Sequence, residues 1–410
     1  MRTTIQNIVN RYQPPLAVTV MLCLCLSILF SLLIYPRIEQ PYHAQQDVDR
    51  YAEIGQSLSR GDGFRFEGAD LPTVSRGPIY PMIIAALSWI TGGFAVWHVQ
   101  LLQAVFLAGA CIVIFYIARQ VFSPVAARWS ALAVALYPLC IWYAARVWTE
   151  TLLVLGVSFL AYRLIRFHHA PTFGRGIMIG IVAGFLALVK AGFLLFIPFI
   201  LVYYLITKQF VAVRQCLFAL ICVAVIVLPW TVRNYRVSNS IIPVQTTASS
   251  NYLIGNAVAR DYFEHPLSLS ISMQKGTEEI AGWMNEAGLS PLDAEEAAGE
   301  NLLKQKAIES FRSDPLFLLR KLGVQALTFW YLGEVPVKSI VLLLIQMPVL
   351  FFALRRLRKA VRENALVVPL LLTIVYWWVI AAFFVAHARI TVPVMPLVLV
   401  LAVSGMVRRA

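Results

Sequence analysis

The stretch LAVTVMLCLCLSILFSLLIY, residues 16–35, contains no charged residue and decides the class of fold. As a helix it is long enough to cross a hydrocarbon core about 30 Å thick. It is too long for the apolar core of a secretory signal and has no small-residue cleavage site, so we expect a retained membrane anchor. The sequence therefore predicts a chain whose main solvent is lipid.

The composition extends this prediction to the whole chain. The 410 residues are 60% hydrophobic and 13% charged, and the mean hydropathy is +0.74, which is outside the range of soluble globular proteins. Because apolar runs recur from end to end, we expect a single membrane domain over residues 1–410, an all-α polytopic bundle. A net charge of +13 could suggest nucleic acid, but the basic residues are scattered at the ends of the apolar runs. We therefore expect the lipid bilayer and no nucleic acid as a partner.

The six cysteines lie inside apolar runs without the spacing of a metal or disulfide framework, so we expect them to act as small core hydrophobes. They are Cys23, Cys25, Cys111, Cys140, Cys216 and Cys222.

The basic clusters give the topology, since positive residues stay on the cytoplasmic side. These clusters are Arg2 with Arg11, Arg119 with Arg128, Arg163 with Arg166 and Arg175, Lys208 with Arg214, residues 355–362, and Arg408 with Arg409. With all of them inside, the predicted spans are 16–35, 97–118, 127–143, 150–167, 176–190, 192–206, 214–230, 337–354, 365–385 and 390–406. The shorter segments 79–90 and 315–330 then lie in the outer interface, and both termini are cytoplasmic.

Two long loops remain on the outer side, residues 36–96 and 231–336. They hold every Asp and Glu except Glu150 and Glu363, so acid–base chemistry is expected there. In the second loop, Ser290 followed by Pro291 is typical of a helix start and predicts a helix through about Phe311. This small helical cap either covers the site or is merely structural.

Three carboxylates are candidates for catalysis. Asp47 and Asp49 precede a short amphipathic helix in the first outer loop, and Glu150 lies between two apolar runs. An ionisable group in such apolar surroundings is costly and indicates function. The alternative for the two aspartates is that they cap the start of the helix, because Asp is favoured there.

Four cations are candidates for binding a phosphate: Arg76, Lys190, Arg233 and Arg389. All four are expected at the outer boundary, where positive residues are unusual. Arginine offers two parallel hydrogen bonds to a phosphate. Arg76 could instead be an interface anchor, and Lys190 a lysine that extends to the interface. We find no nucleotide-binding motif, so a sugar donor would have to be lipid-linked.

Taken in order, these motifs resemble the GT-C superfamily of lipid-dependent glycosyltransferases. The most similar group contains protein O-mannosyltransferases, of glycosyltransferase family 39, and lipid A aminoarabinose transferases. The resemblance spans nearly the whole chain. It rests on residues 47–53, 72–81, 137–150, 180–188 and 229–235, on Gly255 with Asn256, and on Arg389 with Pro393 and Pro396.

The resemblance implies a GT-C-type bundle of about ten spans with interfacial helices in its first outer loop. It places Asp47 at the catalytic carboxylate and Glu150 at a second acidic position of the cavity. Many relatives have Asp-Glu at Asp47-Val48 and a lysine where this chain has Arg76-Gly77. Whether Asp49 shares the catalytic role and whether Arg76 replaces that lysine are therefore open. No cofactor is certain, and a divalent metal stays open because the superfamily contains members of both kinds.

We expect the remaining lining of the substrate cavity to be Arg50, Tyr51, Tyr80, Asn234, Tyr235, Asn256 and His387.

The predicted function is transfer of a sugar from a polyprenyl-phosphate donor to a glycan, lipid or protein acceptor. The transfer would take place on the outer, periplasmic face of the cytoplasmic membrane, by an inverting displacement with Asp47 as general base. Two alternatives are a transporter or flippase for lipid-linked saccharides and a noncatalytic protein of envelope-polysaccharide assembly. Transporters usually show internal repeats, and we detect none.

Overall fold

The chain folds as a bundle of helices, and the residues described by the computed structural model, 13–38, 47 and 49–407, contain no strand. The prediction of an all-α polytopic membrane protein is therefore confirmed. The membrane and connecting elements are α2 (Leu16–Leu29), a π turn η1 (Phe30–Ile34), α3 (Tyr35–Ile38), α4 (Tyr51–Arg60), α5 (Ile79–Thr91), α6 (Val96–Val121), α7 (Pro124–Ala135), α8 (Pro138–Ala144), α9 (Glu150–His169), α10 (Phe173–Val189), a 3-10 turn η2 (Ala191–Leu195), α11 (Phe196–Ile206) and α12 (Phe210–Ser238). They are followed by α13 (Ala248–Asp261), α14 (Leu269–Glu286), a 3-10 turn η3 (Pro291–Glu295), α15 (Ala297–Ser313), α16 (Phe317–Thr328), α17 (Pro336–Glu363), α18 (Val367–Phe383), α19 (Ala388–Thr391) and α20 (Met395–Met406).

Each of the ten predicted spans coincides with a helix or a helix pair. Five continuous helices are long and apolar enough to cross a membrane: residues 16–38, α6, α9, α12 and α17. The pair α7 and α8 forms one further candidate, bent by 49°. The other four predicted spans correspond to the shorter apolar helices α10, η2 with α11, α18 and α20. The chain is thus an integral membrane protein. The basic residues predicted at its ends, Arg2, Arg11, Arg408 and Arg409, lie outside the described residues.

Glycines allow α10 and α12 to pack closely. A Cβ atom at Gly176 would lie 2.8 Å from the Gln215 carbonyl oxygen, and one at Gly180 would lie 2.5 Å from that of Ala219. One turn further along, a Cβ atom at Gly184 would be 3.1 Å from the Ile226 side chain. Small residues at every fourth position let membrane helices approach backbone to backbone. This contact fixes α12 and therefore the place of its outer end.

The α12 helix is longer than the apolar layer of a membrane is thick. The helix has 29 residues, so at 1.5 Å per residue it is roughly 43 Å long, against a hydrocarbon core of about 30 Å. Its last turns carry Arg233 and Asn234 to the first outer loop.

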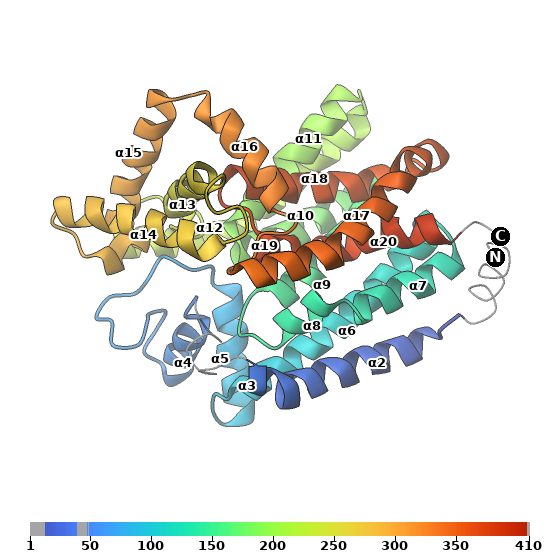
Figure 1. The fold of residues 1–410 in the computed structure, drawn as a ribbon, viewed down its shortest axis with the longest axis horizontal. Coiled ribbons are helices and arrows are strands. Elements are labelled where there is room, and N and C mark those ends of the chain that lie inside the picture. The colour runs from blue at the N-terminus through green and yellow to red at the C-terminus, as the bar shows by residue number, and fades with distance from the viewer. Residues whose placement is uncertain (1–12, 39–46, 48, 408–410) are drawn as a thin grey trace.

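The first outer loop and the second one gather at one end of the bundle (Figure 1). Helices α4 and α5 lie at the left of the view, with α13, α14 and α15 above them, while the start of α2 and the end of α20 lie at the opposite end. We call α13, α14, η3 and α15 the cap. The described residues of two loops that are far apart in the chain, 36–96 and 231–336, therefore meet at one end of the molecule.

The predicted helix from Ser290 to Phe311 differs from the structure in one respect. It is interrupted, because Glu296 is extended (φ −95°, ψ 174°) between η3 and α15. Ser290 does cap the first turn, since its hydroxyl accepts a hydrogen bond from the Leu292 N–H at 3.3 Å. The physical reason for the break lies in two long-range contacts: Glu295 and Glu296 both bond to the first outer loop instead of continuing a helix.

Candidate active site

Asp47 caps the first helix of the outer loop. Its carboxylate accepts hydrogen bonds from the backbone N–H groups of Tyr51 and Ala52, each at 2.7 Å. Its own carbonyl accepts from the Arg50 N–H at 2.8 Å, and Arg50 adopts the left-handed conformation (φ 58°) that this tight turn requires. The capping interpretation of Asp47 is therefore correct as a description of its contacts. A capping carboxylate still has further lone pairs for other partners.

The electrostatic surroundings of Asp47 differ from those of an ordinary cap. Burial raises the pKa of Asp47 to about 7, the two backbone hydrogen bonds oppose this rise, and the neighbouring charges of Asp49 and Glu53 add to it. A carboxylate with a pKa near 7 can both take and release a proton at neutral pH. Asp47 is thus suited to act as a base despite its structural role.

Asp49, two residues later, has the opposite environment. Its carboxylate accepts a hydrogen bond from the Arg389 guanidinium, which also donates to Glu150 Oε1 at 2.6 Å. Burial on its own would raise the pKa of Asp49, but the charges of Arg389, Lys190 and Arg76 outweigh burial and hold that pKa well below its usual range. Asp49 is therefore a permanent anion.

Arg389 connects three segments that are distant in the chain. Besides its bonds to Asp49 and Glu150, its guanidinium carbon lies 3.7 Å from the centre of the Trp148 ring. Glu150 is 2% exposed and is the first residue of α9, where the helix dipole also favours a negative charge. We call Asp49, Glu150 and Arg389 the interhelical network.

Arg76 connects the first outer loop to the cap. Its Nε donates to the Asp49 carbonyl oxygen at 2.9 Å, and its Nη1 donates to Glu295 at 2.6 Å. Beside it, Glu296 accepts from the Thr73 hydroxyl at 2.5 Å and from the Val74 N–H at 3.1 Å. The cap is therefore joined to the loop that carries the carboxylates.

Arg233 holds the same loop from the side of α12. It donates to the carbonyl oxygens of Thr73, at 2.6 Å, and Phe64, at 3.3 Å. Its guanidinium carbon lies 4.8 Å from the centre of the Trp230 ring. Some of the N–H donors of Arg233 are therefore already bound by the protein itself.

Lys190 differs from these three arginines. It follows α10 as the C-cap residue, and its charge acts on Asp49 and Tyr51. Among the residues that the structure describes, no hydrogen bond or ion pair of its ammonium group is found. Gly77 explains how the first loop passes so close, since a Cβ atom there would lie 2.4 Å from the Leu188 carbonyl oxygen. Lys190 is accordingly a cation beside the carboxylates with its donors available.

Two tyrosines and a histidine complete this neighbourhood. The rings of Tyr51 and Tyr80 meet edge to face, with centres 5.3 Å apart, and the buried Tyr80 hydroxyl has no partner among the described residues. Burial lowers the pKa of His387 to about 4, and the Arg389 charge adds to this, against the attraction of Glu334. His387 is therefore neutral at pH 7. Arg50 pairs with Glu53 at 2.7 Å and lies over the Phe66 ring.

Three predicted cavity residues make other contacts. The Asn234 amide donates to the carbonyl oxygens of Ile242 and Val244 at 3.0 and 3.1 Å, while Tyr235 is 51% exposed. Asn256 donates to the Ser310 hydroxyl at 3.1 Å inside the cap. A role for these three in a substrate cavity stays a prediction.

The sequence analysis did not predict a role for Glu295, Glu296 or Trp148. Ser290 with Pro291 predicts the helix of the cap, but it does not indicate partners of the cap that are more than 200 residues away.

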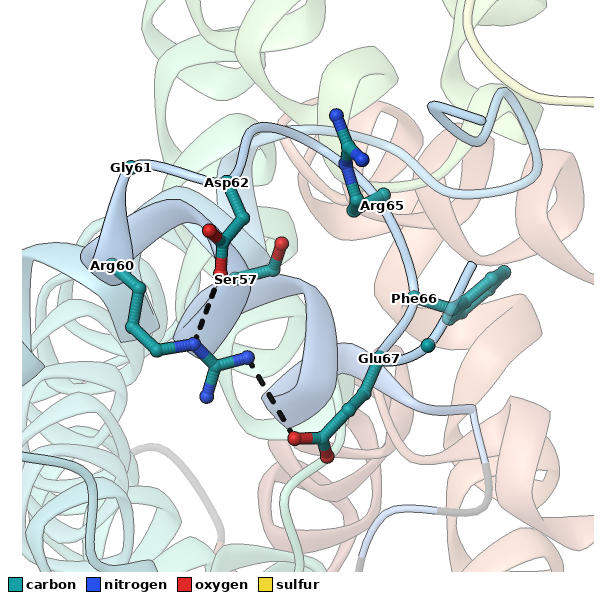
Figure 2. Close-up of a pocket in the computed structure, with 8 residues that line it drawn as sticks. Ser57, Arg60, Gly61, Asp62, Arg65, Phe66 and Glu67 are labelled. Carbon is teal, nitrogen blue, oxygen red and sulfur yellow. Dashed lines mark hydrogen bonds and ion pairs between the residues drawn. The ribbon is translucent and has the colours of Figure 1, made fainter. Parts of the chain in front are cut away.

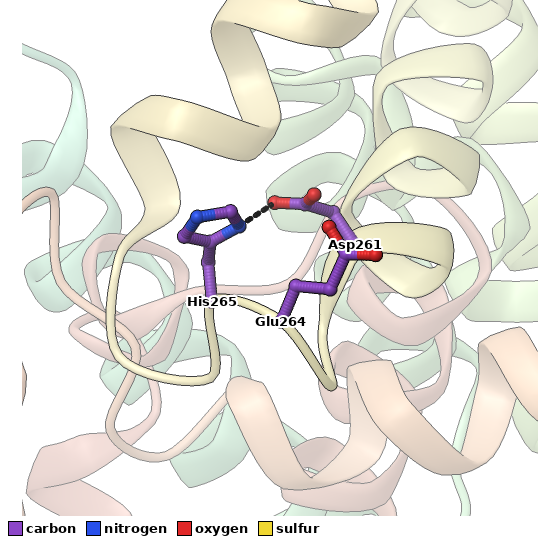
Figure 3. Close-up of side chains that lie close together, drawn as sticks. All are labelled: Asp261, Glu264 and His265. Carbon is purple, nitrogen blue, oxygen red and sulfur yellow. Dashed lines mark hydrogen bonds and ion pairs between the residues drawn. The ribbon is translucent and has the colours of Figure 1, made fainter.

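A second group of charged residues lies on the α13–α14 hairpin. Asp261, Glu264 and His265 have ligand atoms within 4.8 Å of one another, which is the kind of group that could hold a metal (Figure 3). However, the Lys275 ammonium bonds to Asp261 and lies 3.7 Å from Glu264. A cation already neutralises this group, so its arrangement is that of a structural ion-pair cluster.

A polar pocket of about 340 Å³ opens at the end of α4, lined by Ser57, Arg60, Gly61, Asp62, Arg65, Phe66, Glu67 and Gly68. Figure 2 shows Arg60 between Asp62 and Glu67. All three side chains are about half exposed or more, so these ion pairs contribute little.

Comparison with known proteins supports this architecture. Residues 75–232, less than half of the chain, match the family model described as dolichyl-phosphate-mannose-protein mannosyltransferase. No curated protein matches the chain. Among solved structures, the apo oligosaccharyltransferase of Archaeoglobus fulgidus is 13% identical with a TM-score of 0.55. The same organism's oligosaccharyltransferase AglB, in complex with an inhibitory peptide and a dolichol-phosphate, is 14% identical with a TM-score of 0.53.

In both archaeal comparisons the alignment covers 94% of this chain but only 50% of the other, so this chain spans half the length of those proteins. ArnT from Cupriavidus metallidurans bound to undecaprenyl phosphate is 15% identical, with 95% of this chain and 76% of that one aligned and a TM-score of 0.44. The helical order of the chain agrees with the likeness to the two archaeal structures. The chain is an all-helical polytopic membrane protein whose fold is similar to that of these archaeal oligosaccharyltransferases.

Proposed function

We propose that the chain is a glycosyltransferase that moves a sugar from a polyprenyl-phosphate donor to an acceptor hydroxyl, with Asp47 as the general base. One observation carries this proposal: a carboxylate whose pKa is raised to about 7 lies two residues from Asp49, on which the charges of Arg389, Lys190 and Arg76 act. The family match and the polyprenyl phosphates bound by two of the similar structures support the choice of donor. The identity of the sugar and of the acceptor is left open.

The chemical step is a single displacement at the anomeric carbon. Asp47 takes the proton of the acceptor hydroxyl, and the oxygen forms a bond to the anomeric carbon. The bond from that carbon to the phosphate oxygen breaks, and its electron pair leaves with the phosphate. Because one displacement inverts the configuration, the product has the anomeric form opposite to that of the donor.

The leaving phosphate needs cations, and Lys190 is the most available of them. Arg76, Arg233 and Arg389 each bond to acceptors in the protein, but a guanidinium has five N–H donors and can contact a ligand with those that remain. Lys190 has no such engagement among the described residues. We therefore assign Lys190 the main contact to the phosphate, with Arg76 as the next candidate and Arg233 and Arg389 at the edge.

Asp49 and Glu150 then have a supporting role. Both accept hydrogen bonds from Arg389, so each already has a charged partner in the protein. Their charges balance the surrounding cations and keep Arg389 and Lys190 in place when no donor is bound.

The proposed orientation places the site on the outer side of the cytoplasmic membrane. The basic residues of the loops at 119–128, 163–175 and 355–362 support a cytoplasmic position for the opposite end of the bundle. A cysteine introduced at the exposed Asp62 should react with a membrane-impermeant maleimide added to the outer side of intact cells. Labelling only after the membrane is permeabilised would reverse this orientation.

Transfer itself is tested with the purified protein in lipid nanodiscs and radiolabelled polyprenyl-phosphate sugars. Sugar transfer that is lost in Asp47→Asn supports the proposal. In proteoliposomes, movement of the lipid-linked sugar across the bilayer without transfer would favour a flippase, and neither activity would favour an assembly protein. An Asp47→Asn protein that folds and transfers at a near-normal rate would overturn the assignment of the base.

A further inference from the structure

The segment that leads into Arg389 is held by polar side chains of α16, a helix to which no role has been given so far. Residues 384–387 connect α18 to α19, and Arg389 is in the first turn of α19. A short connection of this kind has few backbone hydrogen bonds of its own. Something else must therefore fix the position of the Arg389 side chain between Asp49 and Glu150.

Three polar side chains on one face of α16 are completely buried. Lys321, Gln325 and Thr328 are each 0% exposed, and positions i, i+4 and i+7 lie on the same side of a helix. Burying polar groups is costly unless each has a partner. These three residues are therefore placed to make specific bonds.

The Gln325 amide joins two segments. Its Nε2 donates to the Gly255 carbonyl oxygen of α13 at 2.9 Å, and its Oε1 accepts from the Ala386 N–H at 2.5 Å. One turn later, the Thr328 hydroxyl donates to the Ala386 carbonyl oxygen at 2.9 Å. Both backbone groups of Ala386 are thus bound by α16.

The same segment is held at two more points. The Ala388 N–H donates to the Leu332 carbonyl oxygen at 3.0 Å, and the Trp377 indole donates to the Ile390 carbonyl oxygen at 2.6 Å. The α13 helix also approaches the segment closely, because a Cβ atom at Gly255 would lie 1.7 Å from the Phe384 carbonyl oxygen. Alternate residues on both sides of Arg389 are therefore fixed.

We infer that Gln325, supported by Thr328, is a positioning residue that sets the place of Arg389 in the interhelical network. This inference rests on the proposed function, since it assigns Gln325 an effect on sugar transfer. The amide acts through the backbone at Ala386, three residues before Arg389, and makes no contact with substrate. A misplacement of about 1 Å can cost 10²-fold in rate, so a residue distant from the chemistry can still control it.

The first test removes the clamp and asks whether its effect passes through Arg389. Gln325→Met keeps the volume of the side chain but removes both of its hydrogen bonds. We expect the rate of transfer to fall roughly 10- to 100-fold. In an Arg389→Lys background the same substitution should change transfer less than about twofold, because coupled residues are not additive. Equal losses in both backgrounds would overturn the inference.

Lys321→Met is the matched control. Lys321 lies on the same helix face and donates to the Tyr252 carbonyl oxygen of α13 at 2.9 Å, but it has no bond to residues 384–388 among those described. Burial lowers the pKa of Lys321 to about 6, so the substitution removes a mostly neutral amine at pH 7. If transfer depends on α16 only through the contacts to Ala386, the rate of transfer by Lys321→Met should stay within about threefold of the wild-type rate. A loss as large as that of Gln325→Met would mean that any change in this face acts through stability.

Gln325→Glu tests the inference through the pH dependence of transfer, which a merely structural role would not change. Its carboxyl group can accept from the Ala386 N–H but can donate to the Gly255 carbonyl only when protonated. The transfer rate of this variant relative to wild type should therefore rise as the pH falls, while the ratio for Gln325→Met stays flat. A flat ratio for both variants would overturn the assignment.

Hydrogen exchange separates failure of this inference from failure of the proposed function. A peptide covering residues 384–392 should exchange several times faster in Gln325→Met than in wild type, whatever the protein catalyses. If the wild type transfers no sugar but exchange still accelerates, the clamp stands and the proposed function fails. Unchanged exchange would refute the clamp whether or not the protein is active.

Discussion

Two groups of charged residues in this protein contain similar acidic and basic side chains, but their members lie at very different separations along the chain. The interhelical network joins Asp49, Glu150 and Arg389, with separations of 340 and 239 residues along the chain. We call Asp261, Glu264, His265 and Lys275 the hairpin cluster, and it forms within a stretch in which Asp261 and Lys275 are 14 residues apart. The first requires the entire bundle to fold, whereas the second forms as soon as α13 packs on α14.

The difference teaches which charges to interpret as functional. In the hairpin cluster, Lys275 and Glu264 are 47% and 75% exposed, so water screens their charges and little energy is at stake. In the interhelical network, Glu150 and Arg389 are 2% and 15% exposed. Charges buried at this depth are costly to bring together and weak evidence for stability. A role in positioning or catalysis explains better why the fold keeps them.

The largest effect is expected for Asp47→Asn. The amide oxygen can still accept a hydrogen bond from the N–H of Tyr51 or Ala52, so α4 should stay capped, but the side chain can no longer take a proton. We expect the rate of sugar transfer to fall about 10²–10⁴-fold, the usual contribution of a general base, in single-turnover measurements with saturating donor.

Asp261→Asn is the control for this prediction. It changes an aspartate of the hairpin cluster in the same way and should leave the rate of transfer unchanged. Equal losses in the two variants would mean that both act through folding, and the contrast between the two groups would disappear.

Arg389→Met should be the most destabilising of these variants. It leaves the buried Glu150 and the partly buried Asp49 without their shared partner. Breaking a buried pair in this way typically costs about 3–5 kcal/mol. The free energy of unfolding in mixed micelles, measured by denaturant titration, gives the value. Adding Glu150→Gln should recover part of the loss, because one of the orphaned charges is removed. No recovery in the double variant would show that the charge of Glu150 is not what Arg389 balances.

Local patterns were enough to predict much of the fold. The apolar run 16–35, the cap signal at Ser290 and Pro291, and the bounds of ten spans follow from composition and spacing over tens of residues. Glu150 stands out as a charge in an apolar setting, Arg389 as a cation at the outer boundary, and Asp47 as a carboxylate before the short helix of the first outer loop. Their pairing was not predictable, since nothing near residue 389 indicates that its partners are at 49 and 150. The bonds of Glu295 to Arg76 and of Gln325 to Ala386 were missed for the same reason.

Lys190→Met tests whether a cation that has no partner among the described residues is the one that binds the donor phosphate. Losing a charged hydrogen bond to the phosphate should lower kcat/KM for the lipid-linked donor about 10- to 100-fold, corresponding to roughly 1.5–3 kcal/mol. Lys190→Arg keeps the charge and should recover part of this loss. If Lys190→Met is fully active, the phosphate must be bound by the arginines.

The pH dependence of transfer should report Asp47. With a pKa of about 7, the fraction of ionised base rises about tenfold per pH unit below 7 and then levels off, so kcat/KM should follow the same curve. Asp47→Asn should lose this rise. A wild-type profile that is flat between pH 5 and 8 would exclude Asp47 as the titrating group.

The raised pKa of Asp47 also affects stability. A higher pH should increase the rate of transfer but decrease the free energy of unfolding. The carboxyl holds its proton up to about pH 7 in the folded state, against an ordinary value of 3.8, so between these two values the folded protein binds more protons than the unfolded one. The free energy of unfolding should therefore decrease as the pH rises from about 4 to 7. Asp47→Asn should flatten this part of the stability profile, measured by denaturant titration at each pH.

The smallest effect is expected in the hairpin cluster itself. Lys275→Met removes the cation from Asp261, but the Asp261 carboxylate keeps its bonds to Ser272, at 2.8 Å, and His265, at 3.0 Å. Because the lysine is half exposed, the free energy of unfolding should hardly change. Zinc chloride should not shift the Tm of the wild type, since the ammonium group already occupies the space between the carboxylates. It should raise the Tm of Lys275→Met, in which three ligand groups are left without a cation. A zinc-dependent shift in the wild type would instead mean that the metal displaces Lys275, and the hairpin cluster would then be a binding site rather than a local ion-pair cluster.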